Sequence, residues 1–254
     1  MAVTLFTVST FCIISLKPRI RTVTILVLAL FVSAGTLPLS AQQVDGAALI
    51  QRIDNAALSR IDHVLSYTVT EHYSIYRNAD ETHTAAEMTV KTLYQKGVGK
   101  SYTILSQSGS SLLQKLVLAP LLDNEKTINQ PGNVQKSWFT SSNYEMNLKA
   151  GVKQQMNGHD CIAFDITPRR KAPNMLNGTL WVDAKDGSIV EIDGVSSRSP
   201  SMFSGPAKMM RQYTTMSGFA MAAHARAESD SMVFGRTILT IDYSDYQVQL
   251  TPAH

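Results

Sequence analysis

The residues that most often carry metal or hydrolytic chemistry are present in this chain, but they are scattered. The six histidines are His63, His72, His83, His159, His224 and His254. None of them forms H-E-x-x-H or a paired Cys and His arrangement, which a metal site would need. No serine stands in G-x-S-x-G, and the stretch Ser108-Gly-Ser-Ser111 does not match it. We therefore expect no metal, no cofactor and no catalytic residue, and a hydrolase has the least support.

Three groups of charged residues have structural explanations that we favour over catalytic ones. His159-Asp160 directly follows Asn157-Gly158, so we interpret it as a solvated hairpin tip, although the pair resembles an acid–base dyad. Arg169-Arg-Lys171 is interpreted as a solvated loop rather than an anion site. Four carboxylates fall on two adjacent predicted strands and the turn between them, where alternating charge is typical of a solvent-facing side: Asp183, Asp186, Glu191 and Asp193. Carboxylate catalysis there remains the alternative.

The apolar residues are more informative than the polar ones. Residues 112–122 hold more leucines than one short helix needs for one buried face: Leu112, Leu113, Leu116, Leu118, Leu121 and Leu122. Pro120 is expected to end any helix there. Several methionines, among them Met202, Met209 and Met216, fall in predicted loops or strand ends. Methionine suits a cavity that accepts varied apolar shapes, but composition alone favours an ordinary core.

A helix and many strands must position these residues. Asp45 can cap a helix that runs to about Arg60, because Leu49, Ile53 and Ala57 recur at helical spacing. Residues 66–76 then alternate apolar and polar side chains, which is typical of a strand. Further strands are predicted at 88–95, 100–106, 161–167, 179–183, 188–193, 209–216, 219–228 and 237–249, the last with a bulge near Ser244-Asp245. Residues 124–143 are expected to be loop-like.

These elements predict an α+β fold. We expect a strongly curved antiparallel sheet of roughly nine to eleven strands, an incomplete barrel, with an N-terminal helix and a short covering helix. Within the strand at 179–183, Trp181 is expected to be buried and to have a structural role, with Leu180 or Val182 on the opposite side of the sheet.

The N-terminal residues are typical of an export signal. Lys17, Arg19 and Arg21 precede the apolar run 23–32, and small residues end at Ala41. We predict that residues 1–41 are a signal peptide cleaved near Ala41, and that 42–254 form a single domain. An uncleaved anchor in the inner membrane, with the domain facing the periplasm, is the alternative, and a second apolar stretch at 2–16 favours it.

Charge and cysteine content limit the possible binding partners and disulfide bonds of the mature chain. Of the 23 Lys and Arg residues, three lie in residues 1–41, whereas all 20 Asp and Glu residues lie beyond them. The mature chain is therefore electrically neutral, and we expect no nucleic-acid partner. After removal of Cys12 with the signal peptide, Cys161 has no partner for an intramolecular disulfide and is expected to pack in the core.

The order of several short motifs resembles one bacterial family. The motifs are 157–168 (NGHDCIAFDITP), 177–183 (NGTLWVD), 186–194 (DGSIVEIDG) and 241–248 (IDYSDYQV). In this order they resemble the lipoprotein-localisation-factor superfamily, the outer-membrane lipoprotein-sorting (LolA/LolB-like) proteins. The likeness covers most of residues 45–250 and is loose over residues 100–140. The chain itself has no lipobox.

The resemblance implies a function and partners. We expect a non-enzymatic periplasmic carrier or binding protein, a monomer that takes lipoprotein acyl chains or another lipid between the inner and outer membranes and meets transport components there. The alternative is an envelope stress sensor or scaffold that binds a protein partner with the same barrel. The residues expected to contact hydrophobic cargo are Leu112, Leu113, Leu116, Leu121, Leu122, Met202 and Phe203.

Overall fold

Helix α1 (Gly46–His63) opens the part of the chain that the computed structural model describes, residues 45–252 without 79, 200–204 and 233. The carboxylate of Asp45 accepts hydrogen bonds from the backbone N–H groups of Ala47 and Ala48 at 3.0 and 3.3 Å. Such a cap satisfies donors that have no partner within the helix. The predicted cap is confirmed, and the helix ends three residues beyond the predicted Arg60. The predicted signal peptide and its cleavage site lie outside the described residues.

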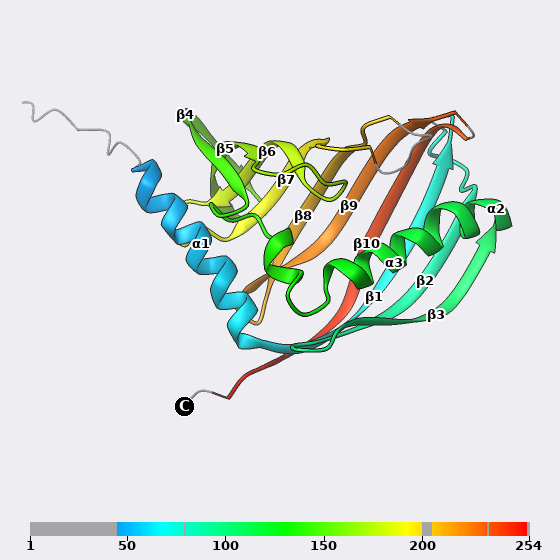
Figure 1. Ribbon diagram of the computed structural model, residues 1–254, viewed down its shortest axis with the longest axis horizontal. Helices are drawn as coiled ribbons and strands as arrows, with labels where there is room; N and C mark the ends of the chain where they lie inside the picture. The colour runs from blue at the N-terminus through cyan, green and yellow to red at the C-terminus, as the bar shows by residue number, and fades with distance from the viewer. Residues whose placement is uncertain (1–44, 79, 200–204, 233, 253–254) are drawn as a thin grey trace, which may run out of the picture. The chain divides into compact units, whose positions relative to one another are not determined.

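Ten antiparallel strands form one open sheet (Figure 1). They are β1 (Val64–Arg77), β2 (Ala86–Gln95), β3 (Gly99–Gly109), β4 (Tyr144–Met156), β5 (His159–Pro168), β6 (Leu176–Asp183), β7 (Ile189–Ser196), β8 (Lys208–Met216), β9 (Phe219–Ser231) and β10 (Gly235–Leu250). The spatial order is β3-β2-β1-β10-β9-β8-β7-β6-β5-β4, so β1 pairs with β10 while β3 and β4 are the two edges. The predicted incomplete barrel is confirmed.

The predicted bulge near Ser244-Asp245 is also present. Thr68 of β1 pairs with Gln247 of β10, whereas Thr70 pairs with Ser244, so β10 carries one extra residue at this point. Asp245 has a φ of 55°, which only a few residue types adopt readily. A bulge bends its strand and increases the local twist, which contributes to the curvature of the sheet.

A helical segment at 111–128 follows β3, and it continues through Pro120. It consists of α2 (Ser111–Leu113), the π-helical turn η1 (Gln114–Leu118) and α3 (Ala119–Ile128). The prediction that Pro120 ends the helix is wrong, and the loop-like segment predicted at 124–143 is helical at residues 124–128. The backbone N–H of Ala119 bonds to the carbonyl of Gln114, five residues earlier. This wider turn shifts the bonding pattern just before the proline, which has no N–H to donate. A 3-10 helix, η2 (Val134–Ser137), leads to β4.

Helix α1 and the helical segment 111–128 both lie on the concave side of the curved sheet (Figure 1). Leu49 and Ile53 of α1 join a core cluster built from β4 to β7, with Phe164 and Leu180 among its members. Residues 111–128 pack on the other half, where their leucines meet side chains of β1, β2, β9 and β10. We call residues 111–128 the covering segment. The concave face is therefore covered by two separate elements, each over one half of the sheet.

The expected alternation around Trp181 and the expected burial of Cys161 are confirmed, but Trp181 does not belong to the core. Leu180 and Val182 are both buried, and Trp181 between them is only partly buried. Because side chains alternate along a strand, the two aliphatic residues take the core face and the tryptophan takes the outer one. Cys161 is buried, and burial raises the pKa of its thiol to about 11, so the thiolate is disfavoured.

Candidate functional site

The covering segment divides its leucines between the concave face and the solvent. Leu113, Leu118 and Leu122 are buried in the cluster that includes Tyr73 and Val90, and Leu121 is partly buried against it. In contrast, Leu112 and Leu116 are each 51% exposed. Of the predicted cargo contacts, Leu113, Leu121 and Leu122 thus share the concave face, and Leu112 and Leu116 do not. Met202 and Phe203 lie outside the described residues.

Polar side chains tie the covering segment to its surroundings at its beginning and its middle. Gln114 donates from Nε2 to the carbonyls of Glu87 and Ser108, both at 2.7 Å. Further along, the hydroxyl of Tyr102 on β3 donates to a carboxylate oxygen of Asp123 at 3.1 Å. These bonds fix the segment against β2 and β3, next to the edge of the sheet.

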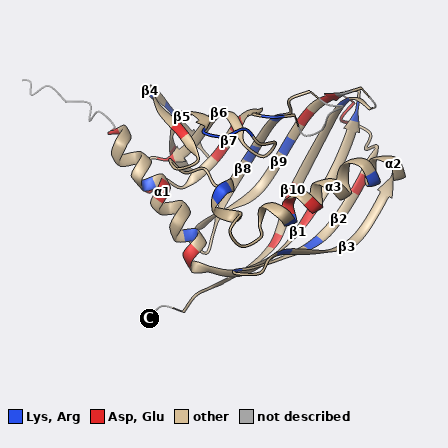
Figure 2. Ribbon diagram, viewed as in Figure 1, with Lys and Arg blue, Asp and Glu red and all other residues tan. Residues whose placement is uncertain are grey.

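A cluster of four charged side chains joins the covering segment to the concave face. We call Glu71 of β1, Lys100 of β3, Glu125 of α3 and Arg211 of β8 the charged cluster. Lys100 Nζ lies 3.1 Å from one carboxylate oxygen of Glu125 and 3.9 Å from Glu71 Oε1. The other Glu125 oxygen lies 3.8 Å from a guanidinium nitrogen of Arg211. Figure 2 shows charged positions of both signs on α3 and on the strands beneath it.

Glu71 is the most deeply buried member of the charged cluster. The residue is 3% exposed, and its Oε2 accepts a hydrogen bond from the hydroxyl of Tyr73. Its Oε1 makes no hydrogen bond with any described residue. A buried oxygen of this kind is costly and is uncommon in folded proteins. Burial, together with the negative charge of Glu71, raises the pKa of Tyr73, so that its hydroxyl stays a donor.

The electrostatics of the charged cluster favour the ionised forms. Burial alone would raise the pKa of Glu125, but the charges of Lys100 and Arg211 outweigh it, and the pKa lies below its usual value. Burial alone would lower the pKa of Lys100, but neighbouring groups including Glu125 and Glu71 hold it well above its usual value. Lys100, Arg211 and Glu125 are therefore charged at neutral pH.

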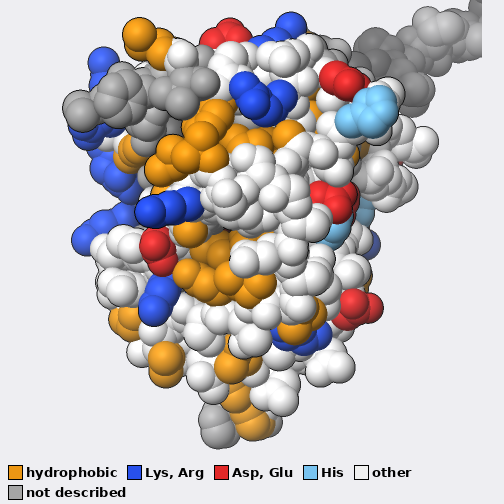
Figure 3. All heavy atoms as spheres, turned by 90° about the vertical axis from the view of Figure 1, so that its right-hand side faces the viewer, with side chains coloured by type: hydrophobic (Ala, Val, Ile, Leu, Met, Phe, Trp, Pro, Cys, Tyr) orange, Lys and Arg blue, Asp and Glu red, His pale blue; other side chains and the backbone are white. Residues whose placement is uncertain are grey.

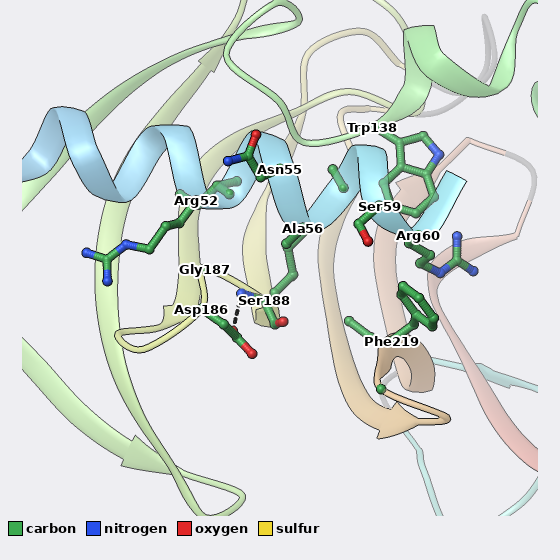
Figure 4. Close-up of a pocket in the computed structure, with 15 residues that line it drawn as sticks. Arg52, Asn55, Ala56, Ser59, Arg60, Trp138, Asp186, Gly187, Ser188 and Phe219 are labelled. Atoms are coloured by element: carbon green, nitrogen blue, oxygen red, sulfur yellow. Dashed lines mark hydrogen bonds between the residues drawn. The ribbon is translucent and has the colours of Figure 1, made fainter. Parts of the chain in front are cut away.

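A cavity of about 300 Å³ lies beside α1 (Figure 4). Its wall combines apolar side chains such as Ile53 and Phe219 with the indole of Trp138 and the arginines Arg52 and Arg60. The guanidinium of Arg60 lies over the Trp138 ring, 4.6 Å from its centroid. Sequence reasoning missed this cavity because its wall combines seven residues of α1 with Trp138 and residues of two hairpins that are far away in the sequence.

Apolar side chains also reach the surface where β3 and the covering segment meet. Ile104 and Leu105 of β3 are exposed, as are Leu112 and Leu116 of the covering segment. Figure 3 shows hydrophobic side chains gathered on this end of the molecule between basic and acidic ones. β3 pairs with β2 alone among the described strands, so its other edge is free of strand pairing.

Little in the described ranges points to metal or acid–base chemistry. His159 Nδ1 lies 2.6 Å from Asp183 Oδ2 on the neighbouring strand, so its partner is not the adjacent Asp160 considered from the sequence. No group of three or more His, Cys, Asp or Glu side chains in this part of the chain is arranged to hold a metal ion. None of its helices is both long and apolar enough to cross a membrane.

No family model matches the chain, and no curated protein matches it either. Solved structures with a similar arrangement include a LolA superfamily protein from Nitrosomonas europaea (TM-score 0.41, 11% identity, 84% of this chain and 96% of that chain covered). Another is a DUF1329 family protein from Desulfovibrio piger (TM-score 0.41, 13% identity, 82% and 94% covered). A third is a domain described as an outer membrane lipoprotein-sorting protein from Vibrio parahaemolyticus (TM-score 0.41, 15% identity, 81% and 95% covered).

Two of these three structures carry the name of the family that the order of the sequence motifs resembles. Likeness at TM-scores of 0.41 and identities of 11–15% does not assign a function. The function is therefore argued from the covering segment, the charged cluster and the concave face of this chain.

Proposed function

We propose that this protein binds the acyl chains of a lipid or lipoprotein on the concave face of its sheet, beneath the covering segment. The observation that carries the proposal is the arrangement of Leu113, Leu118 and Leu122. They fill an apolar face that a half-barrel would otherwise present to water, and they come from one segment that charged side chains join to the sheet. An acyl chain can take the place of these leucines when the segment moves.

The energetics favour such an exchange. An acyl chain in water costs about 0.8 kcal/mol for each exposed CH₂ group, so a protein that moves one must cover it. The leucines and the acyl chain compete for the same apolar surface, which limits the net cost of opening. The cavity of about 300 Å³ beside α1 is at the low end of ligand-pocket sizes, so it can hold only part of a long chain. Binding therefore requires movement of the covering segment.

The charged cluster suits a contact that opens and closes. A buried ion pair gains little net stability, because desolvation of its charges offsets their attraction. When the segment moves away, Lys100, Glu125 and Arg211 regain water, whereas an apolar contact would regain nothing. Elements that open reversibly belong to the least stable parts of a fold.

The compartment follows from the sequence. With the predicted cleavage near Ala41, the domain works in the periplasm as a carrier between the inner and outer membranes, as a monomer that meets transport components at each one. N-terminal sequencing of the exported protein tests this step. A mature N-terminus within two residues of Gln42 is expected, and one before residue 30 would support the anchored alternative.

Native mass spectrometry of the protein purified from its own periplasm tests the binding function. We expect bound lipid at one molecule per chain, and saturable binding of a fluorescent fatty acid after delipidation. Leu116→Ser is the matched control for Leu113→Ser, because the first residue is exposed and the second is buried. Only Leu113→Ser should change the affinity for the fatty acid. Absence of both bound lipid and saturable binding would overturn the proposal.

A protein-binding role is the second candidate, and the edge strand β3 favours it. Ile104 and Leu105 are exposed on this strand, whose outer edge no other described strand pairs with. A peptide can add to such an edge as a further strand. In that case, Leu105→Lys should abolish partner binding and leave fatty-acid binding unchanged, which separates the two functions.

A further inference from the structure

The covering segment brings one charge to the charged cluster, and the sheet brings three. Glu125 is the segment's contribution, while Glu71, Lys100 and Arg211 belong to β1, β3 and β8. Each carboxylate oxygen of Glu125 faces a different cation, at 3.1 and 3.8 Å. The arrangement is that of a two-pronged receptor for a carboxylate, with the receptor on the sheet and the carboxylate on the covering segment.

Movement of the covering segment changes the charge of the concave face. Without Glu125, the sheet retains Lys100 and Arg211 against Glu71 alone, an excess of one positive charge. Lys100 has a side chain only 14% exposed, and the carboxylate that stays on the sheet, Glu71, holds its Oε1 3.9 Å from Lys100 Nζ, farther than the 3.1 Å of Glu125. A cation as little exposed as Lys100 needs a nearby anion, and Arg211, whose side chain is 32% exposed, adds a second positive charge beside it.

The apolar surface begins directly beside these cations. Glu71 pairs in register with Val90 of β2, and Tyr73, two residues further along β1, pairs with Met88. Val90, Tyr73 and Met88 all belong to the cluster that the leucines of the covering segment fill. A ligand with an anionic head at Lys100 and Arg211 would thus place an attached apolar tail along β1 and β2.

We propose that Glu125 occupies the place of the head group of an anionic amphiphile, which binds Lys100 and Arg211 when the covering segment moves away. The proposal rests on the binding function above and adds the chemistry of the head: one oxyanion of single charge, a carboxylate or a phosphodiester. A neutral head group would leave the excess positive charge on the sheet unpaired. A head group with two negative charges would carry more charge than this excess can balance.

Paired probes on the full mature chain test the head group apart from the tail. Palmitate and methyl palmitate share a tail and differ in the charge of the head. We expect palmitate to bind about tenfold to a hundredfold more tightly than the ester, the range that a charge-assisted hydrogen bond supports. The second pair is phosphatidylglycerol, whose head carries a single negative charge, and phosphatidylcholine, whose head carries no net charge. Tighter binding of palmitate than of its ester identifies a site for a carboxylate. Tighter binding of phosphatidylglycerol than of phosphatidylcholine identifies a site for a phosphodiester.

Three variants assign the preference to the charged cluster. Lys100→Gln and Arg211→Gln should each reduce the ratio of palmitate to ester affinity about tenfold, whereas Glu125→Gln should raise that ratio, because it removes the competing carboxylate. Asp123→Asn is the matched control, since Asp123 lies on the same helix but bonds to Tyr102. It should leave the ratio unchanged. Melting temperatures show which variants are folded, and Glu125→Gln alone suffices if the cation variants are not.

The outcomes separate this inference from the function on which it rests. Equal affinity for acid and ester, with both bound, would overturn the anionic head and leave the acyl-binding function intact. An unchanged ratio in Glu125→Gln would overturn the assignment to this cluster. Failure of every probe to bind would overturn the acyl-binding function itself.

Discussion

The two helical elements on the concave face are attached to the sheet in different ways. Helix α1 lies so close to the β6–β7 turn that a Cβ atom at Gly187 would come within 2.6 Å of backbone atoms of Arg52 and Ile53. Asp54 also accepts hydrogen bonds at 2.8 and 2.5 Å from the backbone and hydroxyl of Ser141. The covering segment instead combines buried leucines with side-chain hydrogen bonds near one edge of the sheet and with ion pairs. We expect the first element to stay a fixed part of the core, and the second to be able to separate from it.

A side chain at Gly187 should disrupt the packing of α1 on the β6–β7 turn. Gly187→Val meets the α1 backbone and requires an unfavourable φ of 78°, so we expect a loss of about 3 kcal/mol or more in the free energy of unfolding. Chemical denaturation measures it. Gly218→Ala is the control, because it has a similar φ of 83° but no atom within 4 Å of the added Cβ. Similar losses for both would mean that α1 does not pack closely on this turn.

Two buried leucines, one on each element, sharpen the comparison. Leu49 of α1 and Leu113 of the covering segment are 0% and 1% exposed. Leu49→Ala should reduce the free energy of global unfolding by about 2–5 kcal/mol. Leu113→Ala should reduce it less, because the loss cannot exceed the free energy needed to open the covering segment. Denaturant titrations of both variants measure the difference. Equal losses would show that the covering segment is core of the same kind as α1.

Acid should weaken the covering segment through Glu125. Because the folded state lowers the pKa of Glu125, its ionised form adds stability above the unfolded pKa of about 4.3, and this stability is lost as the pH falls through the folded pKa. We expect Glu125→Gln to cost on the order of 1 kcal/mol at pH 7. The difference in melting temperature between wild type and variant should shrink below about pH 4. A difference that stays constant down to pH 2 would contradict the role given to this carboxylate.

The exposed leucines of the covering segment should have the smallest effect on stability. Leu116→Ala should change the free energy of unfolding by no more than about 0.5 kcal/mol, because the side chain is 51% exposed. Thermal unfolding measures it. A loss close to that of Leu113→Ala would mean that both faces of the covering segment are packed in solution.

Most of the fold could be predicted because its signals are local. The Asp45 cap, the alternation in β1 and β9, and the phase slip near Asp245 each lie within a few consecutive residues. Alternation predicts that Trp181 and its neighbours Leu180 and Val182 face opposite sides of the sheet, but it does not say which side is the core, and the two aliphatic residues take it. The sequence predicts a helix end at Pro120, because the π-helical turn that accommodates this proline has no sequence signature.

The charged cluster could be predicted only in part. Its four members come from β1, β3, α3 and β8, and no sequence spacing connects them. One signal was present: Glu71 shares the apolar phase of β1 with Val69 and Tyr73, and an acidic residue in that phase needs a buried partner. Neither the identity of these partners nor the position of the segment that brings Glu125 follows from a sequence pattern.

Hydrogen–deuterium exchange of the full mature chain, with and without palmitate, tests the central claim most directly. Without ligand, the amides of residues 111–128 should exchange much faster than those of α1, since the covering segment opens without global unfolding. Palmitate should change the amide exchange rates of residues 111–128 and slow the exchange of β1 and β2. The exchange of α1 should stay the same. Equal protection of the covering segment and α1, with no effect of palmitate on β1 and β2, would contradict the account.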